Sequence, residues 1–140
     1  MAKRFGLSDF AYAHRGLWSP SGPPENSLEA FLAAAHAGLG IEFDVRPSAD
    51  GVPVIFHDAI LDRMTRETGM VESYTAAELT RMPLTGGGRL VTLDTLLEAW
   101  PGDTPLLCEI KIDGATDAAE FAADVGARLA SYSGPAAAMS

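Results

Sequence analysis

Two carboxylates and a histidine lie close together in the stretch from Gly40 to Asp58, which reads GIEFDVRPSADGVPVIFHD. Glu42 and Asp44 are two residues apart, so in an extended strand their side chains point to the same face. An exposed, solvated strand face is the alternative interpretation of such a pair. Because charges buried among apolar neighbours need a partner or a metal ion, two acids followed by His57 on otherwise apolar strands predict a chemically active cluster.

The dipeptide Asp50-Gly51 predicts how the histidine returns to the two acids. Asp-Gly is typical of a two-residue hairpin turn, in which both central residues have positive φ. In that register Asp44 would pair with His57, and opposed side chains lie roughly 4.5–5.5 Å apart at Cβ. We therefore expect His57 directly opposite Asp44.

Two other predicted strands also end in polar residues. A buried strand over residues 10–14 leads into His14-Arg15, and a strand over residues 106–112 carries Glu109 and Lys111 on one face. In βα barrels and in open parallel sheets, catalytic groups gather at the carboxyl ends of the strands. We expect the three strand ends to converge on one site.

The residue types at these strand ends suit phosphodiester cleavage. Carboxylate oxygens favour a hard cation such as Mg²⁺ or Ca²⁺ over zinc. Arginine and lysine can hold a phosphate, and two histidines can share proton donation and acceptance near neutral pH. The candidates are Glu42, Asp44 and Glu109 for the metal, Arg15 and Lys111 for the phosphate, and His14 and His57 for proton transfer.

Around these residues, predicted strands alternate with predicted helices. Asn26 and Glu29 resemble a capping box at the start of a helix. Thr92 and Thr116 are expected to cap two further helices, and residues 135–140 predict the start of another strand. This order of elements favours a parallel sheet of the α/β class.

Composition restricts the class of partner and the compartment. The chain has 140 residues, ten basic against nineteen acidic, and a formal net charge of −9. This balance argues against nucleic acid or an anionic membrane as the main partner. With one cysteine no internal disulfide can form. The start lacks the apolar run of a signal peptide and no segment suits a membrane span, so we expect a cytoplasmic location.

Taken together, the motifs resemble those of the glycerophosphodiester phosphodiesterase family. They are AHRG, PENS before a helix, EFDVRPSADGVPVIFHD, LDRMT and EIK, within residues 13–113. The resemblance implies a TIM-type (β/α)8 barrel and metal-dependent hydrolysis of glycerophosphodiesters to sn-glycerol 3-phosphate and an alcohol. Residues 58–90 correspond to the family's insertion and would cap the glycerol end of the substrate. The resemblance also implies metal ligation by Glu42, Asp44 and Glu109, acid/base roles for His14 and His57, phosphate contacts from Arg15 and Lys111, and a place near the site for Glu25.

The length of the chain departs from the family pattern. A TIM barrel takes about 250 residues, so we expect residues 1–140 to form the N-terminal half of such a domain. The chain is then either a fragment of a longer product or one of two copies that complete a closed sheet, since open sheet edges invite self-association. Two alternatives remain open: a sphingomyelinase D-like or lysophospholipase D-like activity, which a long apolar channel would favour, and a non-catalytic half-barrel that binds metal or a partner.

Overall fold

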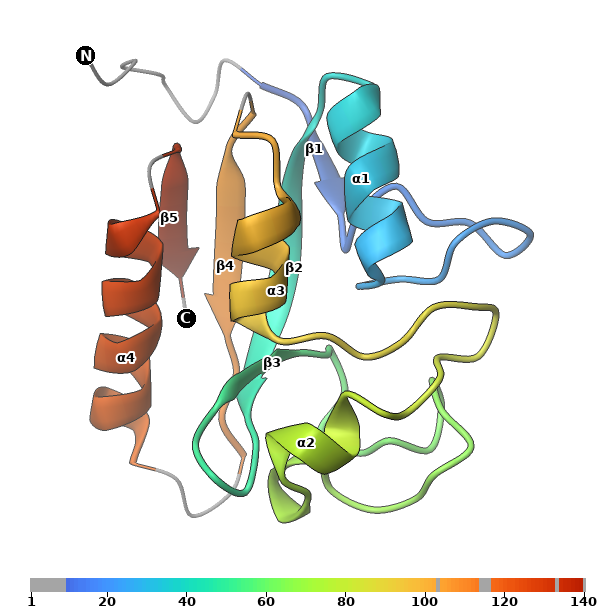
Figure 1. The fold of residues 1–140 in the computed structure, drawn as a ribbon, viewed down its shortest axis with the longest axis vertical. Coiled ribbons are helices and arrows are strands. Elements are labelled where there is room, and N and C mark those ends of the chain that lie inside the picture. The colour runs from blue at the N-terminus through green and yellow to red at the C-terminus, as the bar shows by residue number, and fades with distance from the viewer. Residues whose placement is uncertain (1–9, 103, 114–116, 133, 140) are drawn as a thin grey trace.

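Parallel strands form the centre of the structure, a computed structural model that describes residues 10–102, 104–113, 117–132 and 134–139. The sheet has the strand order β1-β2-β4-β5, and β3 pairs with β2 outside this path (Figure 1). The strands β1, β2, β4 and β5 are mutually parallel, whereas β3 is antiparallel to the end of β2. Their bounds are Tyr12–His14 for β1, Gly40–Pro47 for β2, Pro53–Ile55 for β3, Leu106–Ile110 for β4 and Ala136–Met139 for β5.

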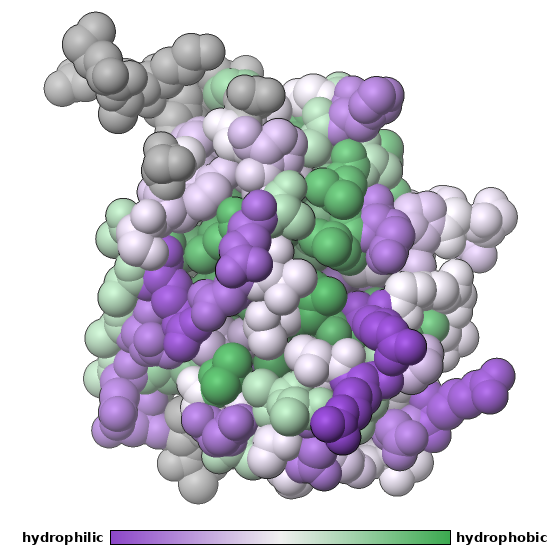
Figure 2. All heavy atoms as spheres, viewed as in Figure 1, coloured by the Kyte–Doolittle hydropathy of each residue, from purple (hydrophilic) through white to green (hydrophobic). Residues whose placement is uncertain are grey.

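Three helices cover one face of the sheet (Figure 1): α1 (Leu28–His36), α3 (Leu93–Ala99) and α4 (Ala118–Ser131). Their apolar stripes pack against the odd-numbered residues of β2 in one core, which includes Phe31, Ile41, Phe43, Val45, Leu96 and Val125. The alternation along β2 therefore turns Glu42 and Asp44 to the opposite face. On the helical side, hydrophilic side chains cover much of α4 and of the segment over 58–90 (Figure 2).

The helix caps differ in part from the predicted ones. Thr92 caps α3 as predicted, with its side chain accepting from the Thr95 N–H. The N-cap of α1 is Ser27 rather than Asn26, because Asn26 has a left-handed φ of 56° and its side chain bonds elsewhere. Asp117 caps α4, and the predicted cap Thr116 lies outside the described residues.

The predicted hairpin register between β2 and β3 is wrong by one residue. Val45 pairs with Ile55, and the Phe56 N–H donates to the Asp44 carbonyl at 3.0 Å, so His57 does not oppose Asp44. The cause is the turn: Gly51 has φ 79° but Asp50 does not have positive φ. The loop therefore has three residues with a left-handed glycine last, and the Ser48 N–H donates to the Val52 carbonyl at 3.0 Å.

The segment over 58–90 lies beyond the end of β2 (Figure 1) and forms a second, smaller apolar core. It contains the short 3₁₀ helix η2 (Val71–Ser73) and the helix α2 (Ala76–Leu79), which begins at a capping box of Thr75 and Glu78. Its core is anchored on the β3 strand and the residue that follows it, through the side chains of Val54, Phe56, Leu61, Val71, Leu79, Met82, Leu84 and Leu90. In the described part of the chain, every helix is too short or too polar to traverse a bilayer.

Candidate active site

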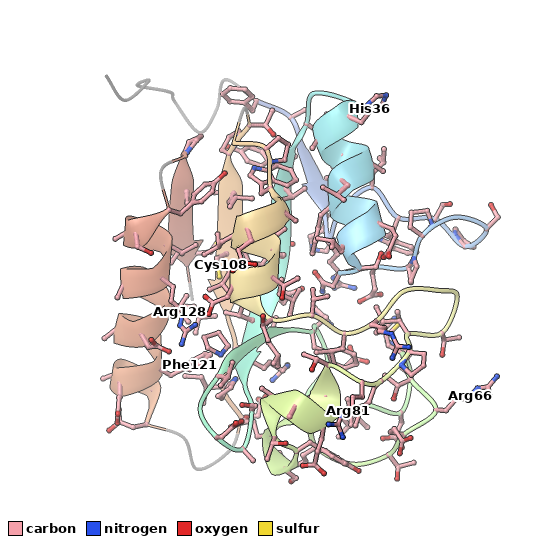
Figure 3. All side chains as sticks on the ribbon, viewed as in Figure 1. His36, Arg66, Arg81, Cys108, Phe121 and Arg128 are labelled. Carbon is pink, nitrogen blue, oxygen red and sulfur yellow. The ribbon has the colours of Figure 1, made fainter. Side chains whose placement is uncertain are left out.

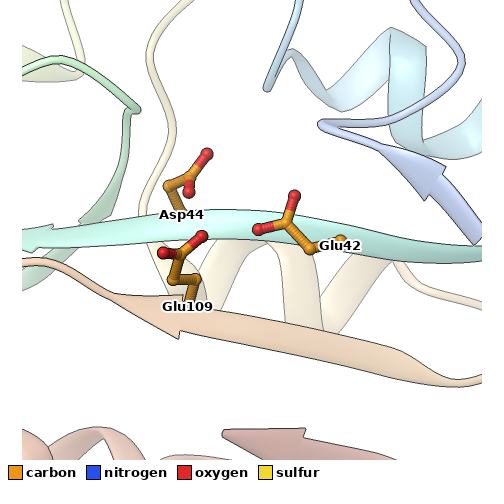
Figure 4. Close-up of side chains that lie close together, drawn as sticks. All are labelled: Glu42, Asp44 and Glu109. Atoms are coloured by element: carbon orange, nitrogen blue, oxygen red, sulfur yellow. The ribbon is translucent and has the colours of Figure 1, made fainter. Parts of the chain in front are cut away.

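Three carboxylates converge on the face of the sheet that the helices leave uncovered. Glu42 and Asp44 project from β2, and Glu109 projects from the adjacent β4, where it is in register with Asp44 (Figure 4). One oxygen from each lies within 4.8 Å of the others. The strand period of two and the parallel register thus bring together the predicted metal ligands.

The carboxylate cluster fits a hard cation. Both Glu42 oxygens and Asp44 Oδ1 are buried without a hydrogen-bond partner among the described residues, and the Asp44 side chain is fully buried. Buried anionic oxygens are costly unless they are paired or bind a metal. Because all three groups offer oxygen only, the cluster suits Mg²⁺ or Ca²⁺ rather than zinc.

The three carboxylates have different proton affinities. Burial, followed by repulsion from Asp44, raises the pKa of Glu42 to about 7. Burial also raises the pKa of Asp44, although the hydrogen bond from Asn26 and then the charge of His57 partly offset this. Burial acts to raise the pKa of Glu109 too, but several other effects, the first of which is the charge of Lys111, together outweigh it and lower that pKa. Glu42 therefore changes its charge near neutral pH.

The raised pKa of Glu42 predicts a pH-dependent response to cations. The pKa of Glu42 rises from 4.5 to about 7 on folding. Protonation of Glu42 therefore contributes stability that is fully present below pH 4.5 and is lost as pH rises through about 7. A cation needs the ionised carboxylate. We expect Mg²⁺ or Ca²⁺ to raise the melting temperature more at about pH 8 than at about pH 5. Thermal unfolding with and without cation measures this, and an equal shift at both pH values would contradict it.

The end of β1 and the turn that follows it place His14 and Arg15 beside the carboxylates. His14 Nε2 lies 3.4 Å from Glu42 Oε2, and Arg15 Nε lies 3.8 Å from Asp44 Oδ2. Arg15 has a left-handed φ of 61°, and its N–H donates to the Glu42 carbonyl at 2.7 Å. Such conformations cost of order 1 kcal/mol and cluster at functional sites. The next residue, Gly16, is also left-handed, and a Cβ there would lie 2.8 Å from Ala30 Cβ.

Asn26 is a site residue that the sequence prediction missed. Its side-chain Nδ2 donates to Asp44 Oδ2 at 3.1 Å, and its N–H donates to the Arg15 carbonyl at 2.8 Å. Asn26 is buried with a left-handed φ, which asparagine tolerates better than most residues. The neighbouring Ser27 could have indicated this role in the sequence. A serine there can cap α1, which leaves the Asn26 side chain available for a contact elsewhere.

The remaining predicted residues lie on two sides of the cluster. Lys111 follows β4, with Nζ 3.3 Å from Glu109 Oε1. His57 follows β3 and contacts Asp58 rather than a member of the carboxylate cluster, with Nδ1 2.9 Å from Asp58 Oδ1. The His57 carbonyl accepts from Arg46 Nε at 3.0 Å and from Arg46 Nη2 at 2.6 Å.

Glu25, the acid of the PENS motif, also lies beside the site. The Glu25 side chain is 5% exposed and pairs with Arg15, whose Nη1 lies 3.3 Å from Glu25 Oε2. It also accepts two hydrogen bonds from Arg63 of the 58–90 segment, at 2.8 and 2.9 Å. Burial acts to raise the pKa of Glu25, but Arg63 and then Arg15 outweigh it and lower that pKa. Glu25 is thus an ionised link between the two arginines.

The chain resembles known proteins over nearly all of its length. A family model for the glycerophosphoryl diester phosphodiesterase family matches residues 14–134. The glycerophosphodiester phosphodiesterase of Caldanaerobacter subterraneus is 35% identical over 114 residues, which cover 76% of this chain and 46% of that protein. The enzyme of Bacillus altitudinis is 44% identical over 71 residues, covering 50% of this chain and 28% of that protein.

Solved structures agree with these sequence matches. A phosphodiesterase from Oleispira antarctica, in complex with the product sn-glycerol-3-phosphate, superposes with a TM-score of 0.76 at 29% identity, covering 91% of this chain and 55% of that one. The chain thus spans about half of this structure and less than half of the two curated relatives. The predicted fold class is confirmed: the parallel sheet and its helices are part of a TIM-type barrel. Since the family model covers residues 14–134, the chain belongs to the glycerophosphoryl diester phosphodiesterase family.

Proposed function

We propose that this chain carries the cation and phosphate site of an enzyme that hydrolyses glycerophosphodiesters to sn-glycerol 3-phosphate and an alcohol. The observation that carries the proposal is the cluster of the buried Glu42 and Asp44 with the half-buried Glu109, with Arg15 and Lys111 beside it. The Oleispira antarctica relative, which binds sn-glycerol-3-phosphate, supports the same substrate class here. We propose that residues 1–140 form the N-terminal half of the catalytic domain.

The mechanism assigns each group a task. A divalent cation held by Glu42, Asp44 and Glu109 would act as a Lewis acid on the phosphate and lower the pKa of a hydroxyl or water. Arg15 and Lys111 neutralise the phosphate oxygens. Of the two histidines, one accepts a proton from the attacking oxygen and the other donates a proton to the leaving alcohol. The two histidines proposed for these roles are His14 and His57.

The 58–90 segment is proposed to cover one end of the substrate. Its Arg63 reaches Glu25 beside Arg15, which supports a place for the segment over the phosphate site. A cavity of about 180 Å³ lies between this segment and the loop after β1, and it is lined by Trp18, Glu25 and Arg63 among others. Trp18 is 42% exposed. The charged Glu25 and Arg63 in its lining suit the polar glycerol end of a substrate.

A substrate comparison tests the proposal. Glycerophosphocholine, lysophosphatidylcholine and sphingomyelin are each incubated with Mg²⁺ or Ca²⁺, using the 140-residue chain and a version extended to the full length of its relatives. We expect the extended version to release sn-glycerol 3-phosphate from glycerophosphocholine. Hydrolysis of sphingomyelin or lysophosphatidylcholine alone would favour the alternative activity, and cation binding without turnover would favour a non-catalytic half-barrel. The cytoplasmic location and self-association through sheet edges stay predictions.

A further inference from the structure

Arg63 connects two loops that flank the carboxylate cluster. Its guanidinium donates to both Glu25 oxygens, from Nη1 at 2.8 Å and from Nη2 at 2.9 Å. The same side chain donates to Asp58, from Nε to Oδ2 at 2.8 Å and from Nη2 to Oδ1 at 3.0 Å. One planar fork therefore joins the loop before α1 to the residue after His57, a geometry that arginine can form and lysine cannot.

Asp58 in turn holds the ring of His57. The distance between Asp58 Oδ1 and His57 Nδ1 is 2.9 Å. The hydrogen bond from Arg63 is the largest effect that lowers the pKa of Asp58, to about 2, so Asp58 is an ionised acceptor at neutral pH. Since a carboxylate can only accept, Nδ1 must carry the proton. The other ring nitrogen, Nε2, is then left without a proton in the neutral imidazole.

The backbone of His57 is fixed from a different direction. Its carbonyl accepts two hydrogen bonds from Arg46, which is 5% exposed and also pairs with Asp113. With the backbone held by Arg46, rotation of the imidazole is the main remaining freedom of this residue. The contact between His57 and Asp58 controls that rotation, and Arg63 holds Asp58.

We propose that Arg63 is a positioning residue for His57, which fixes the imidazole with Nδ1–H directed at Asp58 and Nε2 available for proton transfer. The same guanidinium holds Glu25 against Arg15. The 58–90 segment thereby orients one proposed proton-transfer group and one proposed phosphate-binding group through a single side chain. The part of the inference that concerns catalysis rests on the proposed function, whereas the state of the imidazole does not.

Nitrogen NMR of the histidines tests the inference without an activity assay. The chain has three histidines, so His14→Gln, His36→Gln and His57→Gln assign every imidazole signal in a ¹⁵N-labelled sample. At about pH 8, where a free imidazole is neutral, we expect His57 to show the Nδ1–H tautomer. In Arg63→Gln we expect a shift toward the Nε2–H tautomer that free imidazole prefers. An unchanged tautomer in folded Arg63→Gln would overturn the proposal.

Matched variants separate the arms of the network. Arg66→Gln changes an arginine of the same segment that extends away from the body of the protein (Figure 3), and we expect no change in the His57 signal. Glu25→Gln weakens only the arm to Glu25, so the Nδ1–H tautomer should persist. Should Arg63→Gln fail to fold, Asp58→Ala removes the acceptor and leaves the Arg63–Glu25 pair. It should give the same loss of Nδ1–H, and retention of the tautomer there would also overturn the proposal.

Turnover distinguishes this inference from the proposed function. In the extended version, Arg63→Gln should lower kcat about 10- to 100-fold, as loss of a supporting partner typically does, with a smaller change in KM. Arg63→Lys, which keeps the charge without the fork, should restore only part of kcat. If no version hydrolyses any substrate but the tautomer shifts as described, the proposed function fails and the positioning of His57 stands. Normal kcat in Arg63→Gln would contradict the positioning.

Discussion

Replacing Glu42 by glutamine is expected to abolish the stabilisation that Mg²⁺ or Ca²⁺ gives the folded chain. Glu42 contributes two buried oxygens that lack hydrogen-bond partners among the described residues, and the amide cannot supply a negative charge to a cation. At a cation concentration a hundredfold above Kd, binding stabilises the native state by about 2.7 kcal/mol. Thermal unfolding with cation and with EDTA measures this difference in each variant.

Two features make the Glu42→Gln result specific. In the absence of cation the variant should melt no lower than the native chain, because it removes a buried charge that repels Asp44. Glu98→Gln, on the exposed side of α3, should keep the full cation response. If the native chain, folded, melts identically with cation and with EDTA, the three carboxylates do not form the proposed site.

Loss of either proposed proton-transfer histidine is expected to lower kcat at least ~100-fold in the extended version. The rate should also follow a bell-shaped pH profile, since one histidine must be neutral and the other protonated. His14 lies 3.4 Å from Glu42, and His57 lies 2.9 Å from Asp58, so each has a different carboxylate partner. Steady-state kinetics of His14→Gln and His57→Gln across pH measure the effect.

The third histidine supplies the control for these two variants. His36 is at the end of α1 (Figure 3), on the helical layer rather than beside the carboxylates. His36→Gln should therefore retain the native kcat and pH profile. Near-normal turnover by His14→Gln or by His57→Gln would remove that histidine from the mechanism.

Short-range periodicity predicted the carboxylate cluster well. Glu42 and Asp44 share a face because the strand period is two, and Glu109 joins them because parallel neighbours are in register. Phe121, Val125 and Leu129, which are four residues apart, are likewise buried on one stripe of α4. These features depend only on neighbours along the chain and on the rule that a parallel sheet gathers its strand ends.

Features that depend on loop conformation could not be predicted in this way. The Asp50-Gly51 dipeptide is compatible with two turn types, and the one adopted moves His57 away from Asp44. The cap of α1 could not be predicted for the same reason. The side chain of Asn26 bonds to Asp44, which is distant in the sequence, and Ser27 caps the helix instead. The pair of Arg63 and Glu25 spans 38 residues between two irregular loops, and no periodic pattern reports such a contact.

Anomalous diffraction from a crystal grown with Mn²⁺ in place of Mg²⁺ tests the central claim most directly. Mn²⁺ prefers the same oxygen ligands as Mg²⁺, and its anomalous signal locates it without assumptions about the protein. The expected result is one strong peak within coordination distance of oxygens from Glu42, Asp44 and Glu109. A folded protein with no peak between these three carboxylates, or with its peak elsewhere, would contradict the cation site on which the proposed function rests.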